Sequence, residues 1–250
     1  MNAPFASQLL GWKQLEKSEN LVANSADNNS EPSKKLAAAV LEILGIPRAV
    51  SGGTPPSPGP ALELAVCDNL TTTLASLDAE HVWDVDHKKT ITAFTQYAHL
   101  NKMARLVRKY PELNVEIGRD YLIKPDVTVG ANSSLLPDKH PLLHAAVSCK
   151  WTIRSDRVQN IRHEFLQMIR HRRGRLPHLV AVTAEPMPSR IAAIARGTGE
   201  VDAVYHIAFD ALAEAVQAVG SQQQKNDWHE CVEQRRLLPY EQLAPTLATS

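Results

Sequence analysis

The sequence has few cysteines, few aromatic residues and no net charge. Its three cysteines, Cys67, Cys149 and Cys231, lie far apart, so their spacing fits neither a disulfide framework nor a zinc site. Aromatic residues make up 5% of the chain, which argues against a stacking surface for single-stranded nucleic acid. The 27 basic and 27 acidic residues cancel, so any nucleic-acid binding must be sought in the local distribution of charge.

Long apolar runs are also absent. No stretch approaches the roughly 20 apolar residues of a membrane span, and the N-terminus lacks the order of a signal peptide. We therefore expect a cytoplasmic protein without membrane contact. The 250 residues, 44% of them hydrophobic, suffice for one sizeable core, so we expect a single domain over residues 1–250. Its expected irregular parts are a flexible N-terminal arm at 1–35 and a proline- and glycine-rich loop at 51–60.

Hydrophobic patterns predict an α/β fold with a central mixed β-sheet flanked by helices. Apolar residues at helical spacing predict helices at 36–44, 62–74, 90–110, 155–171, 189–196 and 209–219. Apolar or β-branched runs predict strands at 120–129, 143–152, 179–183 and 201–207. The first two of these strands are expected to be a hairpin or neighbours.

Two acids and a lysine follow one another on these predicted elements. Asp126 lies in one strand after Pro125, Lys150 lies near the end of the next, and Glu164 flanks the apolar stripe of the following helix. Hydrolysis of a phosphodiester needs carboxylates that hold divalent cations beside a positive charge. Spacing alone leaves two interpretations equally open: a metal-dependent nuclease centre, or solvated carboxylates with an edge-strand lysine.

The order Pro125-Asp126, Ser148-Cys149-Lys150 and Glu164 resembles the PD-(D/E)XK nuclease motif, in the variant where a serine replaces the middle acid. Residues 141–160 and 174–206 resemble NgoMIV-type type II restriction endonucleases, and the likeness runs from about residue 59 to about 207. It implies the restriction-endonuclease-like fold and Mg²⁺, two ions per active site. By the same resemblance, Asp126, the Cys149 carbonyl and Glu164 bind metal, Lys150 acts at the attacking water with Ser148 beside it, and Glu63 is an auxiliary acid. For Glu63 the alternative is an exposed helix carboxylate.

The helix that carries Glu164 begins with Arg154, Asp156 and Arg157, a set suited to reading G·C pairs in the major groove. Asp156 has an alternative role as a helix cap. The resemblance implies that these three residues read a central CCGG and that Arg190, assisted by Asp27, reads an outer G·C pair, which gives the target GCCGGC. Independently, residues 150–175 contain eight Lys or Arg against two acids, an excess of six positive charges that predicts phosphate contact.

Two alternatives remain at this point: a repair or recombination nuclease of the same fold, and a non-catalytic DNA-binding relative. The expected partner is double-stranded DNA. A palindromic target requires two symmetric sites, so we expect a homodimer. The resemblance leaves a tetramer open, although the stretch Val127 to Cys149 looks shorter than in such enzymes. It also implies a cognate cytosine methyltransferase in the same cell.

Overall fold

The computed structural model describes residues 2–249 except 16–19, 51–54, 113–121, 133–139 and 198, and it does not describe the side chains of 155–157. A six-stranded mixed sheet in the order β3-β4-β5-β6-β7-β8 forms its centre. The strands are β3 (Val82–His87), β4 (Val127–Asn132), β5 (Leu142–Lys150), β6 (His178–Thr183), β7 (Ala203–His206) and β8 (Leu237–Pro239). β3, β4 and β5 pair antiparallel, while β5 to β8 pair parallel. This mixed sheet confirms the predicted fold class.

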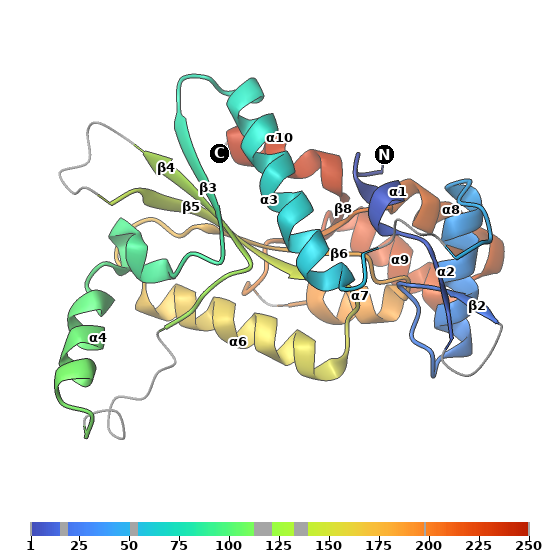
Figure 1. The fold of residues 1–250 in the computed structure, drawn as a ribbon, viewed down its shortest axis with the longest axis horizontal. Helices are drawn as coiled ribbons and strands as arrows, with labels where there is room; N and C mark the ends of the chain where they lie inside the picture. Colours follow the sequence, from blue (N-terminus) through green and yellow to red (C-terminus); the bar gives the residue numbers. More distant parts are fainter. Residues whose placement is uncertain are drawn as a thin grey trace.

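Helices cover both faces of the sheet (Figure 1). One face carries α3 (Pro58–Leu77) together with α10 (Leu243–Ala248), and the other carries α6 (Ser155–His171) and α7 (Pro188–Ala195). Because helices lie on both sides, all but the two end residues of β5 are buried, and so are all residues of β6 after His178. The remaining helices in the described part of the chain are α1 (Ala6–Leu9), α2 (Glu31–Ile43), α4 (Leu100–Lys109), α8 (Phe209–Val219) and α9 (Gln222–Glu233). Of the helices that the structure describes, none is both long enough and apolar enough to cross a membrane.

The N-terminal region differs from the flexible arm expected for residues 1–35. Its described parts form α1, the small antiparallel pair β1 (Trp12–Gln14) and β2 (Leu21–Ala23), and the start of α2. Phe5, Leu10 and Trp12 are buried in the core. Phe5 packs edge-on against Tyr240, α1 contacts α3, and α2 packs against α8 (Figure 1). A loop was expected at 51–60, but α3 begins at Pro58, so residues 58–60 are helical.

The single helix predicted at 90–110 is wrong. The structure has two short 3₁₀ turns, η1 (Ile91–Ala93) and η2 (Thr95–Tyr97), before α4 begins at Leu100. The buried residues Ile91, Phe94, Tyr97 and Leu100 recur every three positions, which matches the three residues per turn of a 3₁₀ helix. The Gln96 side chain also bonds both backbone groups of Leu143, which anchors these turns to β5.

Other predicted elements agree with the structure more closely. α6 and α8 have the predicted bounds, and β5, β6, β7 and α7 lie within a few residues of theirs. The strand expected at 120–129 begins instead at Val127, so Asp126 precedes the strand; residues 120 and 121 lie outside the described part. β3, α9, β8, η3 (Tyr240–Gln242) and α10 were not predicted.

Candidate active site

Asp126 and Lys150 form an ion pair at the end of the central strands. The Lys150 Nζ atom lies 2.7 Å from Asp126 Oδ2. The same carboxylate oxygen accepts a 2.8 Å hydrogen bond from the Cys149 backbone N–H and a 3.4 Å bond from the Ser148 hydroxyl. Both charged side chains remain partly exposed, 23% for Lys150 and 19% for Asp126, so the pair is accessible to a substrate.

The β4–β5 ladder brings these residues together. Val127 pairs with Val147 in antiparallel register, so Asp126, one residue earlier, falls opposite Ser148, one residue later. Side chains alternate along a strand, so Ser148 and Lys150 share one face while Cys149 faces the other. The pairing therefore depends on the register of a buried sheet, which is strongly specified.

Glu164 joins this pair from α6. Burial raises the pKa of its carboxyl, the nearby Lys150 ammonium opposes that rise, and the negative charge of Asp126 adds to it. Glu164 therefore lies close enough to Lys150 and Asp126 for both charges to shift its pKa. A half-buried carboxyl beside a second carboxylate favours the approach of a cation.

Glu63 is brought to the same end of the sheet from the opposite face. Its Oε2 lies 2.9 Å from His87 Nε2 and 3.0 Å from Lys88 Nζ. Burial alone would raise the pKa of Glu63, but the bonds to His87 and Lys88 outweigh it, and the pKa is lowered. Lys88 adopts a left-handed backbone with φ of 61°, and its N–H donates to the Asp126 carbonyl at 3.1 Å. With a 13% exposed side chain, Glu63 is not the exposed helix carboxylate of the alternative.

The carboxylate oxygens near Lys150 are of the chemical type that binds a hard divalent cation. Asp126 and Glu164 supply carboxylate oxygens at the end of β5, and Glu63 supplies a third nearby; oxygen ligands suit Mg²⁺. Within the part of the chain that the structure describes, no three His, Cys, Asp or Glu side chains already form a metal-binding group. One of these oxygens, Asp126 Oδ2, accepts a 2.7 Å hydrogen bond from Lys150 Nζ.

A second cluster of charges lies between the beginnings of α6 and α7. Arg190 Nη2 lies 2.6 Å from Asp27 Oδ2, which joins residues 163 positions apart. The Arg190 bond lowers the pKa of Asp27, the Asn29 N–H adds to this effect, and Arg154 also contributes. Arg154 is exposed and precedes the first residue of α6. The side chains of Asp156 and Arg157 lie outside the described residues, so the structure places three of the five predicted DNA-reading side chains together.

A cleft of about 350 Å³ separates the two helix starts in this cluster. Its walls come from α6 and the preceding residues Ile153 and Arg154, and from Ser189, Arg190 and Ala193 of α7. The two arginines therefore line one concavity, which can admit a polar group of a ligand.

Glu185 packs against this cluster, and no sequence pattern predicted it. Its side chain is 0% exposed, and Arg190 Nη1 lies 3.8 Å from its Oε2. Burial raises the pKa of Glu185 to about 7, although the Ile153 N–H and Arg190 act in the opposite direction. Glu185 comes two residues after a strand that is buried on both faces, where an acid is usually solvated, so no local pattern marked its burial.

The basic excess of residues 150–175 is divided in the structure. Arg162 donates to the Ala193 carbonyl of α7 at 2.8 Å, and the Arg173 N–H donates to Gln96. A helix of this length places its two ends roughly 24 Å apart. The arginines at the C-terminal end of α6 therefore cannot contact the same phosphate as Lys150.

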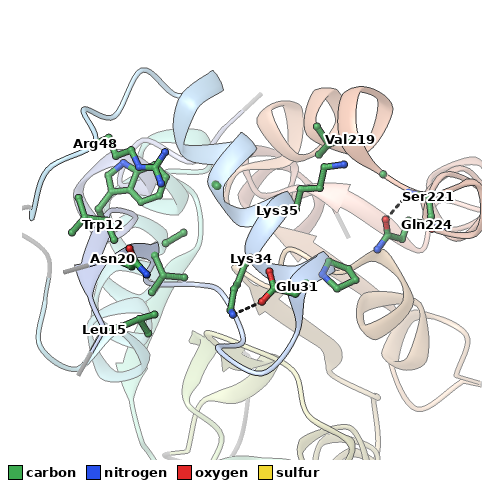
Figure 2. Close-up of a pocket in the computed structure, with 16 residues that line it drawn as sticks. Trp12, Leu15, Asn20, Glu31, Lys34, Lys35, Arg48, Val219, Ser221 and Gln224 are labelled. Carbon is green, nitrogen blue, oxygen red and sulfur yellow. Dashed lines mark hydrogen bonds and ion pairs between the residues drawn. The ribbon is translucent and has the colours of Figure 1, made fainter. Parts of the chain in front are cut away.

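A larger groove of about 960 Å³ lies between the N-terminal strands, α2 and the α8–α9 connection (Figure 2). Arg48 stacks over the Trp12 ring at 5.1 Å, and Lys34 pairs with Glu31 at 2.6 Å. Among the predicted catalytic and DNA-reading residues whose side chains the structure describes, none lines this groove.

A central mixed sheet, with an Asp–Lys pair on adjacent strand ends and a Glu on the next helix, defines a nuclease of the restriction-endonuclease class. The family model of the NgoMIV restriction enzyme matches residues 8–139 and 132–248. The chain is also 35% identical to the type II restriction enzyme NgoMIV of Neisseria gonorrhoeae over 277 aligned positions, covering 98% of this chain and 96% of that protein. The chain therefore belongs to the NgoMIV restriction enzyme family and is a type II site-specific deoxyribonuclease.

Among solved structures, the chain is similar to the type IIF restriction endonuclease Bse634I with cognate DNA. The TM-score is 0.41 at 11% identity, and the match covers 85% of this chain and 98% of that one.

Proposed function

We propose that this restriction enzyme cuts both strands of DNA at GCCGGC in a Mg²⁺-dependent reaction, with Asp126, Lys150 and Glu164 as its catalytic centre. The observation that carries the chemical part is the 2.7 Å Asp126–Lys150 pair, to which the Glu164 carboxyl is electrostatically coupled. The 35% identity to NgoMIV over nearly the whole chain supports the target sequence.

Asp126, Glu164 and the Cys149 carbonyl would hold the metal, two ions per site. When bound, Mg²⁺ polarises the scissile phosphate and lowers the pKa of a coordinated water. Cys149 also has a second function in this scheme, because its N–H holds the Asp126 carboxylate at 2.8 Å. The buried Cys149 thiol has a raised pKa, since burial disfavours the thiolate, so the backbone carbonyl is the donor we assign.

Lys150 would move from Asp126 to the attacking water and the scissile phosphate. Its ammonium offers three donors, so it can orient the water and balance the negative charge that develops on the phosphate. Ser148 shares the Asp126 oxygen and would steady that carboxylate as the lysine leaves. Glu63, held by His87 and Lys88, would act as an auxiliary acid. Lys88 connects it to Asp126, because the Lys88 N–H donates to the Asp126 carbonyl.

Sequence reading would come from two helix starts. Arg154, Asp156 and Arg157 would contact the central CCGG, because arginine bonds guanine and a carboxylate accepts from the cytosine amino group. Arg190 would read the outer G·C pair while Asp27 holds its guanidinium, and the 2.6 Å Asp27–Arg190 contact supports this division of roles. Only the residues Trp151–Ile153 separate Lys150 from Arg154, which would couple reading to cleavage.

A twofold homodimer would present two such sites to the palindromic target. The family-model match breaks into two parts at residues 132–139, inside the stretch between Asp126 and Lys150 that looked short. We therefore propose the dimer as the working assembly and keep the tetramer as the alternative. A cognate cytosine methyltransferase would protect the host DNA.

The test is cleavage of two matched plasmids, one with a single GCCGGC and one in which that site has a single base exchanged. With Mg²⁺, we expect cutting of the first plasmid alone, and EDTA should abolish it. Cutting of both plasmids at scattered positions would support a nuclease without this sequence preference. Binding without cutting in Mg²⁺ would contradict the proposed catalytic centre.

A further inference from the structure

Asp27, Arg154 and Arg190 form the proposed reading cluster. Glu185 connects the beginnings of α6 and α7, where the two arginines lie. It follows the end of β6, and its Oε2 accepts a 2.7 Å hydrogen bond from the Ile153 N–H, directly before Arg154 and α6. Its Oε1 accepts a 3.1 Å bond from the Met187 N–H, the residue that caps α7. One carboxylate therefore fixes the backbone at the beginning of both helices.

A third segment joins through Arg190. The Arg190 guanidinium lies between Glu185, at 3.8 Å, and Asp27, at 2.6 Å. Asp27 is itself held in a turn before α2, because its side chain accepts from the Asn29 N–H and its own N–H donates to the Ser33 hydroxyl. Segments near residues 27, 153 and 187 are thus linked through the buried carboxylate of Glu185.

Burial of a carboxylate is costly unless its oxygens are satisfied. The groups that face Glu185 are the Ile153 and Met187 N–H groups, the Arg190 guanidinium and, beyond it, the Asp27 carboxylate. Its backbone carbonyl accepts from His206 Nε2 at 3.1 Å, and burial lowers the pKa of His206 to about 4, so this histidine is neutral. A neutral, well-packed residue would stabilise this position at a lower cost, which suggests that the charge serves function.

We infer that Glu185 is a positioning residue for specificity: its ionised carboxylate sets the spacing between Arg154 and Arg190, and so determines whether both arginines meet their base pairs together. This inference rests on the proposed reading roles of those two arginines. A bidentate contact to guanine demands close alignment, so a small displacement of either helix start weakens the correct contact more than phosphate binding, which is less directional.

The substitution Glu185→Gln tests this with little change in size. An amide has one acceptor oxygen, so its NH₂ group must face either the Ile153 or the Met187 N–H, a donor against a donor. The matched control is Asp227→Asn, because Asp227 is also a buried carboxylate that binds an arginine, Arg196 at 2.7 Å, but lies on α9 away from the reading cluster.

The wild-type target is first determined by sequencing the ends of cut genomic DNA. Discrimination is then the ratio of kcat/KM on that target to kcat/KM on duplexes with one base pair exchanged. We expect Glu185→Gln to lower this ratio at least tenfold, and Asp227→Asn to leave it within twofold even if it lowers the Tm as much. A target other than GCCGGC would overturn the proposed specificity and leave this comparison valid.

The wild-type enzyme supplies a second measurement that needs no variant. Because burial raises the pKa of Glu185 to about 7, the carboxylate is mostly ionised at pH 8 and mostly protonated at pH 6. A protonated oxygen becomes a donor and releases one N–H, so discrimination should be higher at pH 8 than at pH 6, and Glu185→Gln should remove this difference. An unchanged ratio in Glu185→Gln, or a wild-type ratio that is flat with pH, would overturn the inference.

Discussion

The proposed catalytic cluster (Asp126, Lys150 and Glu164) and the proposed reading cluster (Asp27, Arg154 and Arg190) adjoin at residues 150–154 but are held in different ways. Asp126 and Lys150 sit on the ends of paired strands, and their side chains stay about one-fifth exposed. Arg154 and Arg190 sit at helix starts outside the ladder, and their positions depend on the fully buried side chain of Glu185. Sheet register aligns the first cluster, whereas a desolvated carboxylate aligns the second.

The difference follows from the task of each cluster. Chemistry at a phosphate requires groups that can exchange partners, and an ion pair near the surface is weak enough to open. Base recognition requires donors that stay fixed before the DNA arrives, because alignment during binding would cost conformational entropy. Substitutions in the first cluster should therefore affect rate, and those in the second should affect sequence choice.

The largest expected effect is on rate. Lys150→Ala should reduce cleavage about a thousandfold, the upper range for loss of one transition-state donor, while specific binding in Ca²⁺ persists. The matched control is Lys89→Ala. Lys89 pairs with Asp84 at the same 2.7 Å and with similar exposure, but it follows the edge strand β3. If Lys150→Ala cuts as well as the control, the catalytic assignment is wrong.

A smaller effect is expected on sequence choice. Arg190→Ala should reduce discrimination at the outer base pair by about 1 to 3 kcal/mol, or roughly 5- to 150-fold, with little change at the central pairs. Arg196→Ala is the control, because Arg196 follows the same helix α7 but binds Asp227 and Glu230 instead. A uniform loss at every position, measured with duplexes exchanged one base pair at a time, would show a phosphate contact instead.

The smallest effect concerns the connection between the clusters. The Trp151 indole N–H donates to the Asn24 carbonyl at 3.1 Å and ties the connector to the N-terminal segment. Trp151→Phe should lower the free energy of unfolding by about 1 kcal/mol and cleavage by less than tenfold. Trp83→Phe, which loses a similar bond to Asp78, should match the loss of stability in denaturant titrations without affecting cleavage. Equal cleavage by the two variants would mean that the connector does not link the clusters.

The sequence patterns predicted the elements that local hydrophobicity determines. β5 and β6 are apolar runs covered on both faces, and α6 has a clear apolar stripe. The predicted bounds of these elements therefore lie close to the observed ones. The 90–110 segment failed because its apolar residues suit two periods, and contacts of Gln96 and Tyr97 with β5 and α6 decide between them. β3 was not predicted, although Trp83, Val85 and His87 alternate with aspartates, a pattern typical of a strand.

The candidate site was predictable only in part for a similar reason. Asp126, Lys150 and Glu164 stand at motif spacing, but their meeting depends on the β4–β5 register. The Asp27–Arg190 contact joins residues 163 positions apart, and a family resemblance rather than any local pattern suggested it. The burial of Glu185 has no local signature, since an acid after a strand is usually solvated.

The antiparallel-to-parallel change at β5 has a consequence for how such an enzyme could acquire a new target. β5 continues into α6, and the neighbouring parallel strand β6 continues into α7, so both helices start at the same edge of the sheet. Because Glu185 bonds the backbone at both starts, a change at the α7 start that displaces this carboxylate would also displace the α6 start. We expect that directed evolution toward a changed outer base pair will yield viable enzymes mainly from libraries that vary positions 27, 185 and 190 together.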